Sequence, residues 1–75
     1  MDIERLKRDL LDARTVLRTG RGVLGLDGLA RTIDELGPKY RIHAKNLRLL
    51  KAPAQLDAEI TMTLDKIEWD PDSGR

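Results

Sequence analysis

Apolar residues in the first quarter of the chain recur at alternating spacings of three and four. This spacing places them on one side of a helix and predicts a helix from about residue 2 to 19. The same stripe also suits a short coiled-coil seam between two copies of the chain. The residues concerned are Ile3, Leu6, Leu10, Ala13 and Leu17.

A glycine-rich segment follows, and Gly20, Gly22 and Gly25 form the pattern Gly-x-Gly-x-x-Gly. A dinucleotide-binding loop with this pattern follows a strand, whereas here it follows a predicted helix, so a plain connector is expected. Beyond it, Asp27 is expected to cap a second helix over residues 28–36. Gly37 and Pro38 would end that helix.

The segment from residue 40 to 69 is compatible with two structures. As strands, Tyr40, Ile42 and Ala44 alternate with polar residues, and residues 58–64 alternate in the same way. A helix over residues 39–51 would leave Ile42 and Leu49 on the side opposite its other apolar residues. A helix from Pro53, in contrast, would carry a good apolar stripe.

Pairing of the two candidate strands decides between these structures in favour of a hairpin. Folding the chain back near residues 51–55 brings apolar residues together on one face and opposes Arg41 to Asp65 and Arg48 to Glu59 on the other. We therefore predict an α+β fold, with two N-terminal helices packed on a C-terminal antiparallel β-hairpin. An all-α bundle of three or four helices is the alternative.

Residues 1–69 are expected to form a single small domain, and residues 70–75 a flexible acidic tail. Five residues are predicted to be buried in its core: Leu10, Leu17, Ile33, Ile60 and Leu64. A chain of 75 residues buries only about 60% of its unfolded surface, so we expect self-association to support this core.

The net charge of +1 hides an uneven distribution. Residues 1–51 hold 12 Lys and Arg against 7 Asp and Glu, a balance of +5, whereas residues 52–75 hold 2 against 6, a balance of −4. The chain has no cysteine and no apolar run long enough to span a membrane. We accordingly expect a cytoplasmic protein without a membrane partner.

Residues suited to catalysis or metal binding are scarce. The chain has one histidine, His43, which is expected at the surface of a strand, and one serine, Ser73, in the tail. A nucleophile with a histidine base could be assembled only through this tail serine, and one histidine cannot supply a four-ligand zinc site. The sequence therefore predicts a protein that is not an enzyme and needs no cofactor or metal.

One set of residues could contact a partner, and it surrounds the start of the ambiguous segment: Lys39, Arg41, His43, Lys45, Arg48 and Lys51. We expect a protein-binding module, an adaptor, inhibitor or structural subunit that self-associates. The alternative is a small nucleic-acid-binding regulator that uses the basic stretch 39–51. If that stretch is helical, residues 29–51 resemble a helix-turn-helix, although Ala30 and Gly37 are further apart than the usual spacing of about four.

Overall fold

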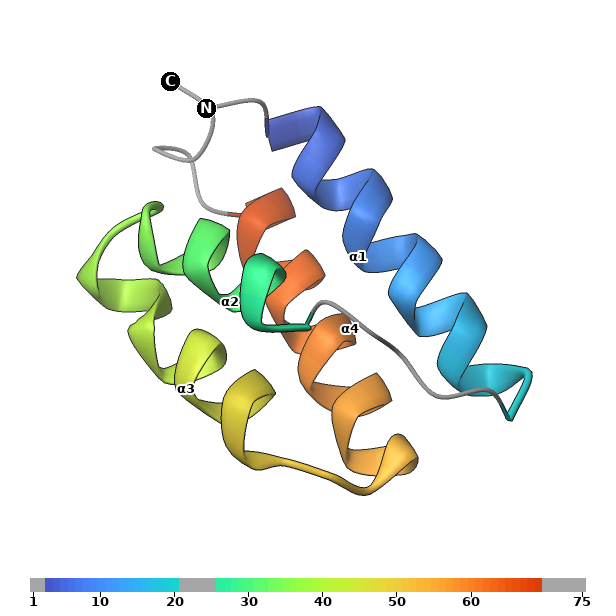
Figure 1. Cartoon of the computed structure of the whole chain (residues 1–75). Helices are drawn as coiled ribbons and strands as arrows, with labels where there is room; N and C mark the ends of the chain where they lie inside the picture. The colour runs from blue at the N-terminus through green and yellow to red at the C-terminus, as the bar shows by residue number, and fades with distance from the viewer. Residues whose placement is uncertain (1–2, 21–25, 70–75) are drawn as a thin grey trace.

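The computed structural model describes residues 3–20 and 26–69, and helices are the only regular secondary structure in this part of the chain. Four α-helices and one 3₁₀ turn follow each other, and the described residues include no strand (Figure 1). The elements are α1 (Ile3–Arg18), α2 (Leu26–Asp34), η1 (Pro38–Tyr40), α3 (Arg41–Leu49) and α4 (Pro53–Trp69). The long helices α1 and α4 lie side by side, and α3 lies against α2 and α4.

The predicted β-hairpin, and with it the α+β class, is wrong, and the all-α alternative describes the fold. Residues 41–49 form α3, whose buried side is made by His43, Ala44 and Leu47. Because one of these three buried residues is a histidine, the apolar residues alone do not reveal the whole buried side of this helix. Ile42 and Leu49, which argued against a helix, are exposed to solvent on α3.

Helix α4 also owes its buried side partly to polar residues. Leu56, Ile60 and Ile67 are buried together with Glu59 and Thr63. The Thr63 hydroxyl donates a hydrogen bond of 2.8 Å to the Glu59 carbonyl oxygen one turn earlier, so its burial leaves no polar atom unpaired. Such back-bonding lets threonine occupy a helix interior despite its preference for strands.

The two ion pairs expected across the hairpin do not form. Arg48 Nη2 lies 2.9 Å from Asp34 Oδ2 on α2, while Glu59 pairs with His43. Arg41 and Asp65 are both exposed. Arg48 and Glu59 therefore each contact a different helix through another partner, and the expected charge pairs set no strand register.

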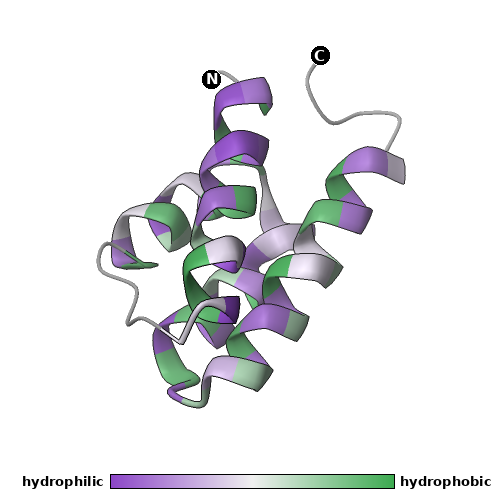
Figure 2. Ribbon diagram, turned by 90° about the vertical axis from the view of Figure 1, so that its right-hand side faces the viewer, coloured by the Kyte–Doolittle hydropathy of each residue, from purple (hydrophilic) through white to green (hydrophobic). Residues whose placement is uncertain are grey.

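The core lies between the four helices and contains most of the residues predicted for it. Leu10, Leu17, Ile33 and Ile60 are buried as predicted, whereas Leu64 is only partly buried at its edge. Every helix carries hydrophobic and hydrophilic bands, as expected for helices with one buried side (Figure 2).

The second helix begins earlier than predicted. It starts at Leu26, so that Asp27 lies in its first turn instead of capping it, and it ends at Asp34. The Gly22 and Gly25 positions of the glycine pattern, and the predicted tail 70–75, lie outside the described residues. Among the helices described, none combines the length and the apolar character needed to cross a membrane.

Polar contacts hold α1 against α4 along their outer edge. Arg18 donates two hydrogen bonds to the Asp57 carboxylate, from Nε at 2.7 Å and from Nη2 at 3.1 Å. Lys7 Nζ lies 3.2 Å from Glu68 Oε2 near the other end of α1. One contact joins the end of α1 to the start of α4, and the other joins the start of α1 to the end of α4. The two helices therefore run antiparallel.

The Arg18–Asp57 pair predicts a pH-dependent contribution to stability. Its hydrogen bonds hold the pKa of the Asp57 carboxyl below its usual value of 3.8, aided by the charges of Arg18 and Arg14. Because the folded state lowers this pKa, the stabilisation is present above the usual value and is lost as the pH falls through the folded pKa. We expect Arg18→Gln to lower the melting temperature at pH 7 and to have a much smaller effect near pH 2.

The control for this measurement is Arg8→Gln, which removes the same charge from the same helix without touching Asp57. Thermal melts followed by circular dichroism at a series of pH values would give the melting temperatures. A difference between wild type and Arg18→Gln that stays constant over the acidic range would contradict the assigned role of the pair.

Candidate functional site

The turn that leads into α3 is fixed to α4. Gly37 has φ of +130°, a conformation that favours glycine, and it precedes the 3₁₀ turn Pro38–Tyr40. The Tyr40 ring is buried, and its hydroxyl donates a hydrogen bond of 3.4 Å to the Lys66 carbonyl oxygen. Lys66 Nζ in turn donates to the Lys39 carbonyl oxygen and lies 5.2 Å from the centre of the Tyr40 ring. The start of α3 therefore has a defined position on the molecule.

The buried side of α3 is held by a pair of polar side chains. His43 Nδ1 lies 2.6 Å from Glu59 Oε1, and both side chains are more than nine-tenths buried. The prediction of a surface histidine is therefore wrong, and His43 is not accessible to a partner. The sequence gives little sign of this pair, because 16 positions separate its members.

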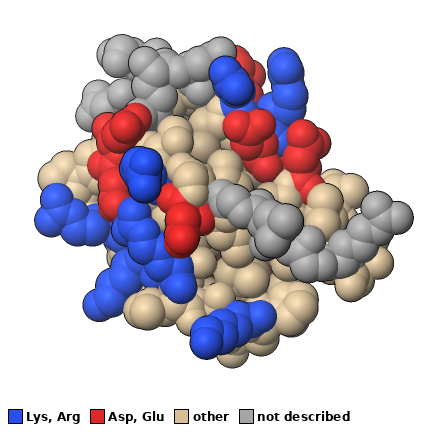
Figure 3. All heavy atoms as spheres, in the orientation of Figure 1, with Lys and Arg blue, Asp and Glu red and all other residues tan. Residues whose placement is uncertain are grey.

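The outward side of α3 carries most of the predicted contact residues. Arg41, Lys45 and Arg48 are exposed on the helix, and Lys39 and Lys51 are exposed just before and after it. In Figure 3, Lys and Arg side chains gather over the lower left of the molecule, the region occupied by α3 in Figure 1. We call these five residues the basic face; His43 is the only predicted contact residue that does not belong to it.

One member of the basic face also holds α3 against α2. Arg48 forms an ion pair with Asp34 Oδ2, while Asp34 Oδ1 is buried and has no hydrogen-bond partner among the described residues. The Arg48 side chain is 41% exposed. Arg48 therefore orients α3 and still contributes positive charge to its surface.

Two aliphatic residues share the outward side of α3, and sequence reasoning did not include them in the site. Ile42 and Leu49 are 54% and 62% exposed. Their position opposite the buried stripe was visible in the sequence, but only as an argument against a helix. In the structure, the same position gives the surface of α3 two exposed aliphatic side chains.

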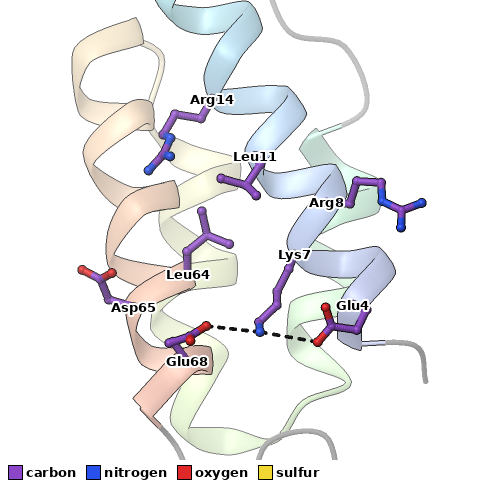
Figure 4. Close-up of a pocket in the computed structure, with 8 residues that line it drawn as sticks. All are labelled: Glu4, Lys7, Arg8, Leu11, Arg14, Leu64, Asp65 and Glu68. Atoms are coloured by element: carbon purple, nitrogen blue, oxygen red, sulfur yellow. Dashed lines mark ion pairs between the residues drawn. The ribbon is translucent and has the colours of Figure 1, made fainter.

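A groove lies between α1 and α4, away from the basic face (Figure 4). Leu11 and Leu64 face each other across this groove of about 560 Å³. Lys7 spans it and pairs with Glu4 at 3.5 Å and Glu68 at 3.2 Å. The remaining lining residues are Arg8, Arg14 and Asp65. Because acidic and basic groups alternate here and Lys7 is already paired, the groove offers no concentrated charge to a ligand.

The described residues contain no group of three or more His, Cys, Asp or Glu side chains placed to hold a metal ion. Comparison of the chain with protein-family models, with curated proteins and with solved structures gives no match. The basic face is therefore the surface of the described residues from which a function can be inferred.

Proposed function

We propose that this chain is a small regulator that binds double-stranded DNA through the basic face of α3. The observation that carries the proposal is the placement of Arg41, Lys45 and Arg48 on the solvent side of one well-anchored helix, with Lys39 and Lys51 at its two ends. Phosphate contacts from such side chains supply most of the affinity of proteins for duplex DNA.

The dimensions of α3 support this choice of ligand. A helix of nine residues is about 13 Å long and about 10 Å wide with its side chains, which suits the roughly 12 Å wide major groove of B-form DNA. The helix is attached to the molecule by His43, Ala44 and Leu47, so the basic face can enter a groove without disturbing the core.

The arrangement differs from the common DNA-binding helix-turn-helix. Helix α2 ends at Asp34 and α3 begins at Arg41, so residues 35–40 connect them, whereas the usual turn has about three or four residues. The proposal therefore rests on the exposed side of α3 and its anchoring by Tyr40 and Arg48, and not on the motif.

The proposal predicts weak, salt-sensitive binding to duplex DNA of mixed sequence. If all five residues of the basic face contact phosphates, the association constant should fall roughly 500-fold between 50 and 200 mM salt. Arg41→Ala should weaken binding and reduce the slope of log K against log salt by about one. Fluorescence anisotropy with a labelled duplex measures both quantities.

The matched control is Arg8→Ala, which removes the same charge from an exposed position on α1. It should leave the salt slope nearly unchanged. Equal effects of the two variants would indicate a general charge effect and contradict the proposal. The absence of binding by the wild-type chain at 50 mM salt would also contradict it.

Self-association is a second candidate function, and two exposed apolar residues of α4 favour it. Met62 and Trp69 are 54% and 83% exposed on the solvent side of α4, and their separation of seven positions places them on one face. We propose a second copy of the chain as the occupant of this face, as expected for a domain with so small a core. Such a dimer would also present two basic faces to DNA.

This second proposal has a direct spectroscopic test, because Trp69 is the only tryptophan of the chain. Its emission maximum should shift to shorter wavelength as the protein concentration rises, in step with dimer formation in sedimentation equilibrium. Since the contact is apolar, high salt should not abolish the shift. A monomer at all concentrations would overturn this proposal and leave DNA binding to be tested separately.

A further inference from the structure

Aliphatic side chains occupy the centre of the outward side of α3. Ile42, Lys45 and Leu49 follow each other at spacings of three and four, which places them along one line on the helix. Arg41 and Arg48 lie beside this line. The surface that would face a major groove therefore combines basic groups with two apolar ones beside them.

Folding does not require these two aliphatic residues. Neither Ile42 nor Leu49 belongs to the buried core or to the partly buried residues packed against it. Phosphate binding does not require them either, because an aliphatic side chain has no charge or hydrogen-bond donor to offer. The two residues thus form an apolar surface that the proposed phosphate contacts do not use.

The major groove of DNA contains a matching apolar group. Each thymine presents its 5-methyl group there, and aliphatic side chains are a common means of recognising it. Arginine and lysine beside them suit the O6 and N7 acceptors of guanine. The basic face therefore combines the side-chain types that contact phosphates with those that contact base edges.

We infer that Ile42 and Leu49 recognise thymine methyl groups in the major groove, so that the chain prefers thymine-containing duplex DNA. This inference rests on the proposed function, because it assumes that α3 enters the groove. It also separates DNA from RNA: RNA has uracil in place of thymine, and the major groove of its A-form helix is too deep and narrow for side chains to read.

The test compares duplexes that differ only in this methyl group. A binding duplex is first selected from a random-sequence DNA pool by the wild-type protein, and it is then synthesised with thymine or with deoxyuridine at the same positions. Deoxyuridine keeps the base pair with adenine but lacks the methyl group. Wild-type protein should bind the uracil duplex about fourfold more weakly for each methyl group that it buries.

The variants Ile42→Ala and Leu49→Ala identify the side chains responsible. Each should weaken binding to the thymine duplex and reduce the penalty for uracil. Since both residues are exposed, the melting temperature should stay near that of wild type. Leu11→Ala is the matched control for Leu49→Ala, because Leu11 is also an exposed leucine, 43% accessible, on α1.

The possible results separate this inference from the proposed function. Salt-sensitive binding with equal affinity for thymine and uracil duplexes would overturn the inference and leave DNA binding in place. A uracil penalty that persists unchanged in both α3 variants would overturn the assignment to Ile42 and Leu49. Failure to select any duplex at low salt would overturn the proposed function and this inference together.

Discussion

We expect Glu59→Ala to lower the free energy of unfolding by about 1–3 kcal/mol, the usual cost of leaving a buried polar group without its hydrogen-bond partner. The carboxylate lies 2.6 Å from His43 Nδ1, and the pair joins α4 to α3. Without it, the histidine nitrogen is left buried with no partner. A domain of this size has a total stability of only about 5 kcal/mol, so the variant should lose a large share of it.

Two further variants give this prediction its controls. Glu59→Gln keeps a side chain of the same size with both a hydrogen-bond donor and an acceptor for the His43 ring, so it should retain more stability than Glu59→Ala. Glu68→Ala removes an exposed carboxylate from the same helix, with a side chain 64% accessible, and should cost at most about 1 kcal/mol. Urea unfolding followed by circular dichroism measures the three differences. Equal stability of Glu59→Ala and Glu68→Ala would show that the buried pair contributes little.

Leu10→Ala is expected to be at least as severe and to lower the free energy of unfolding by about 2–5 kcal/mol. Leu10 is completely buried between the helices, and removing its side-chain atoms leaves a cavity that the small core cannot easily close. The loss combines the apolar surface no longer buried with the contacts missing around the cavity.

The neighbouring residue provides a matched control for Leu10. Leu11→Ala makes the identical substitution one position further along α1, where the side chain is 43% exposed. It should change the free energy of unfolding by less than about 1 kcal/mol. A comparable loss in both variants would contradict the orientation assigned to α1. Unfolding curves in urea, analysed with a common slope, distinguish these outcomes.

The stability and binding experiments address opposite sides of α3. His43, Ala44 and Leu47 face inward and connect the helix to the rest of the molecule, whereas Ile42 and Leu49 are exposed. Substitution of Ile42 or Leu49 should therefore change DNA binding without changing stability. Variants of the inward side should impair binding only to the extent that they unfold the protein.

Sequence reasoning was most successful where one helix carries a regular apolar stripe. The spacing of Leu6, Leu10, Ala13 and Leu17 predicts α1 and its buried side, and all four residues are buried. Ile33 and Ile60 were also recognised as core residues. These predictions hold because the periodicity of an amphipathic helix is a local property that requires no knowledge of its neighbours.

The candidate site was only partly predictable, because local spacing carries no information on contacts between helices. Lys39, Arg41, Lys45, Arg48 and Lys51 could be identified from charge alone, and the structure places all five at the surface. The role of His43 depends on a carboxylate from another helix, and the exposure of Ile42 depends on which side of α3 meets α4. Neither contact is encoded in local spacing.

The sequence by itself determined that α1 is an amphipathic helix, that positive charge concentrates around residues 39–51 and that the chain contains a small set of aliphatic core residues. Only the tertiary structure decided whether residues 40–69 form strands or helices, because strand and helix patterns both fit their apolar residues. Burial of His43, Glu59 and Thr63 in the helical packing resolves the choice. His43 and Glu59 share a hydrogen bond that exists only when α3 packs against α4, and the Thr63 hydrogen bond exists only when α4 has formed.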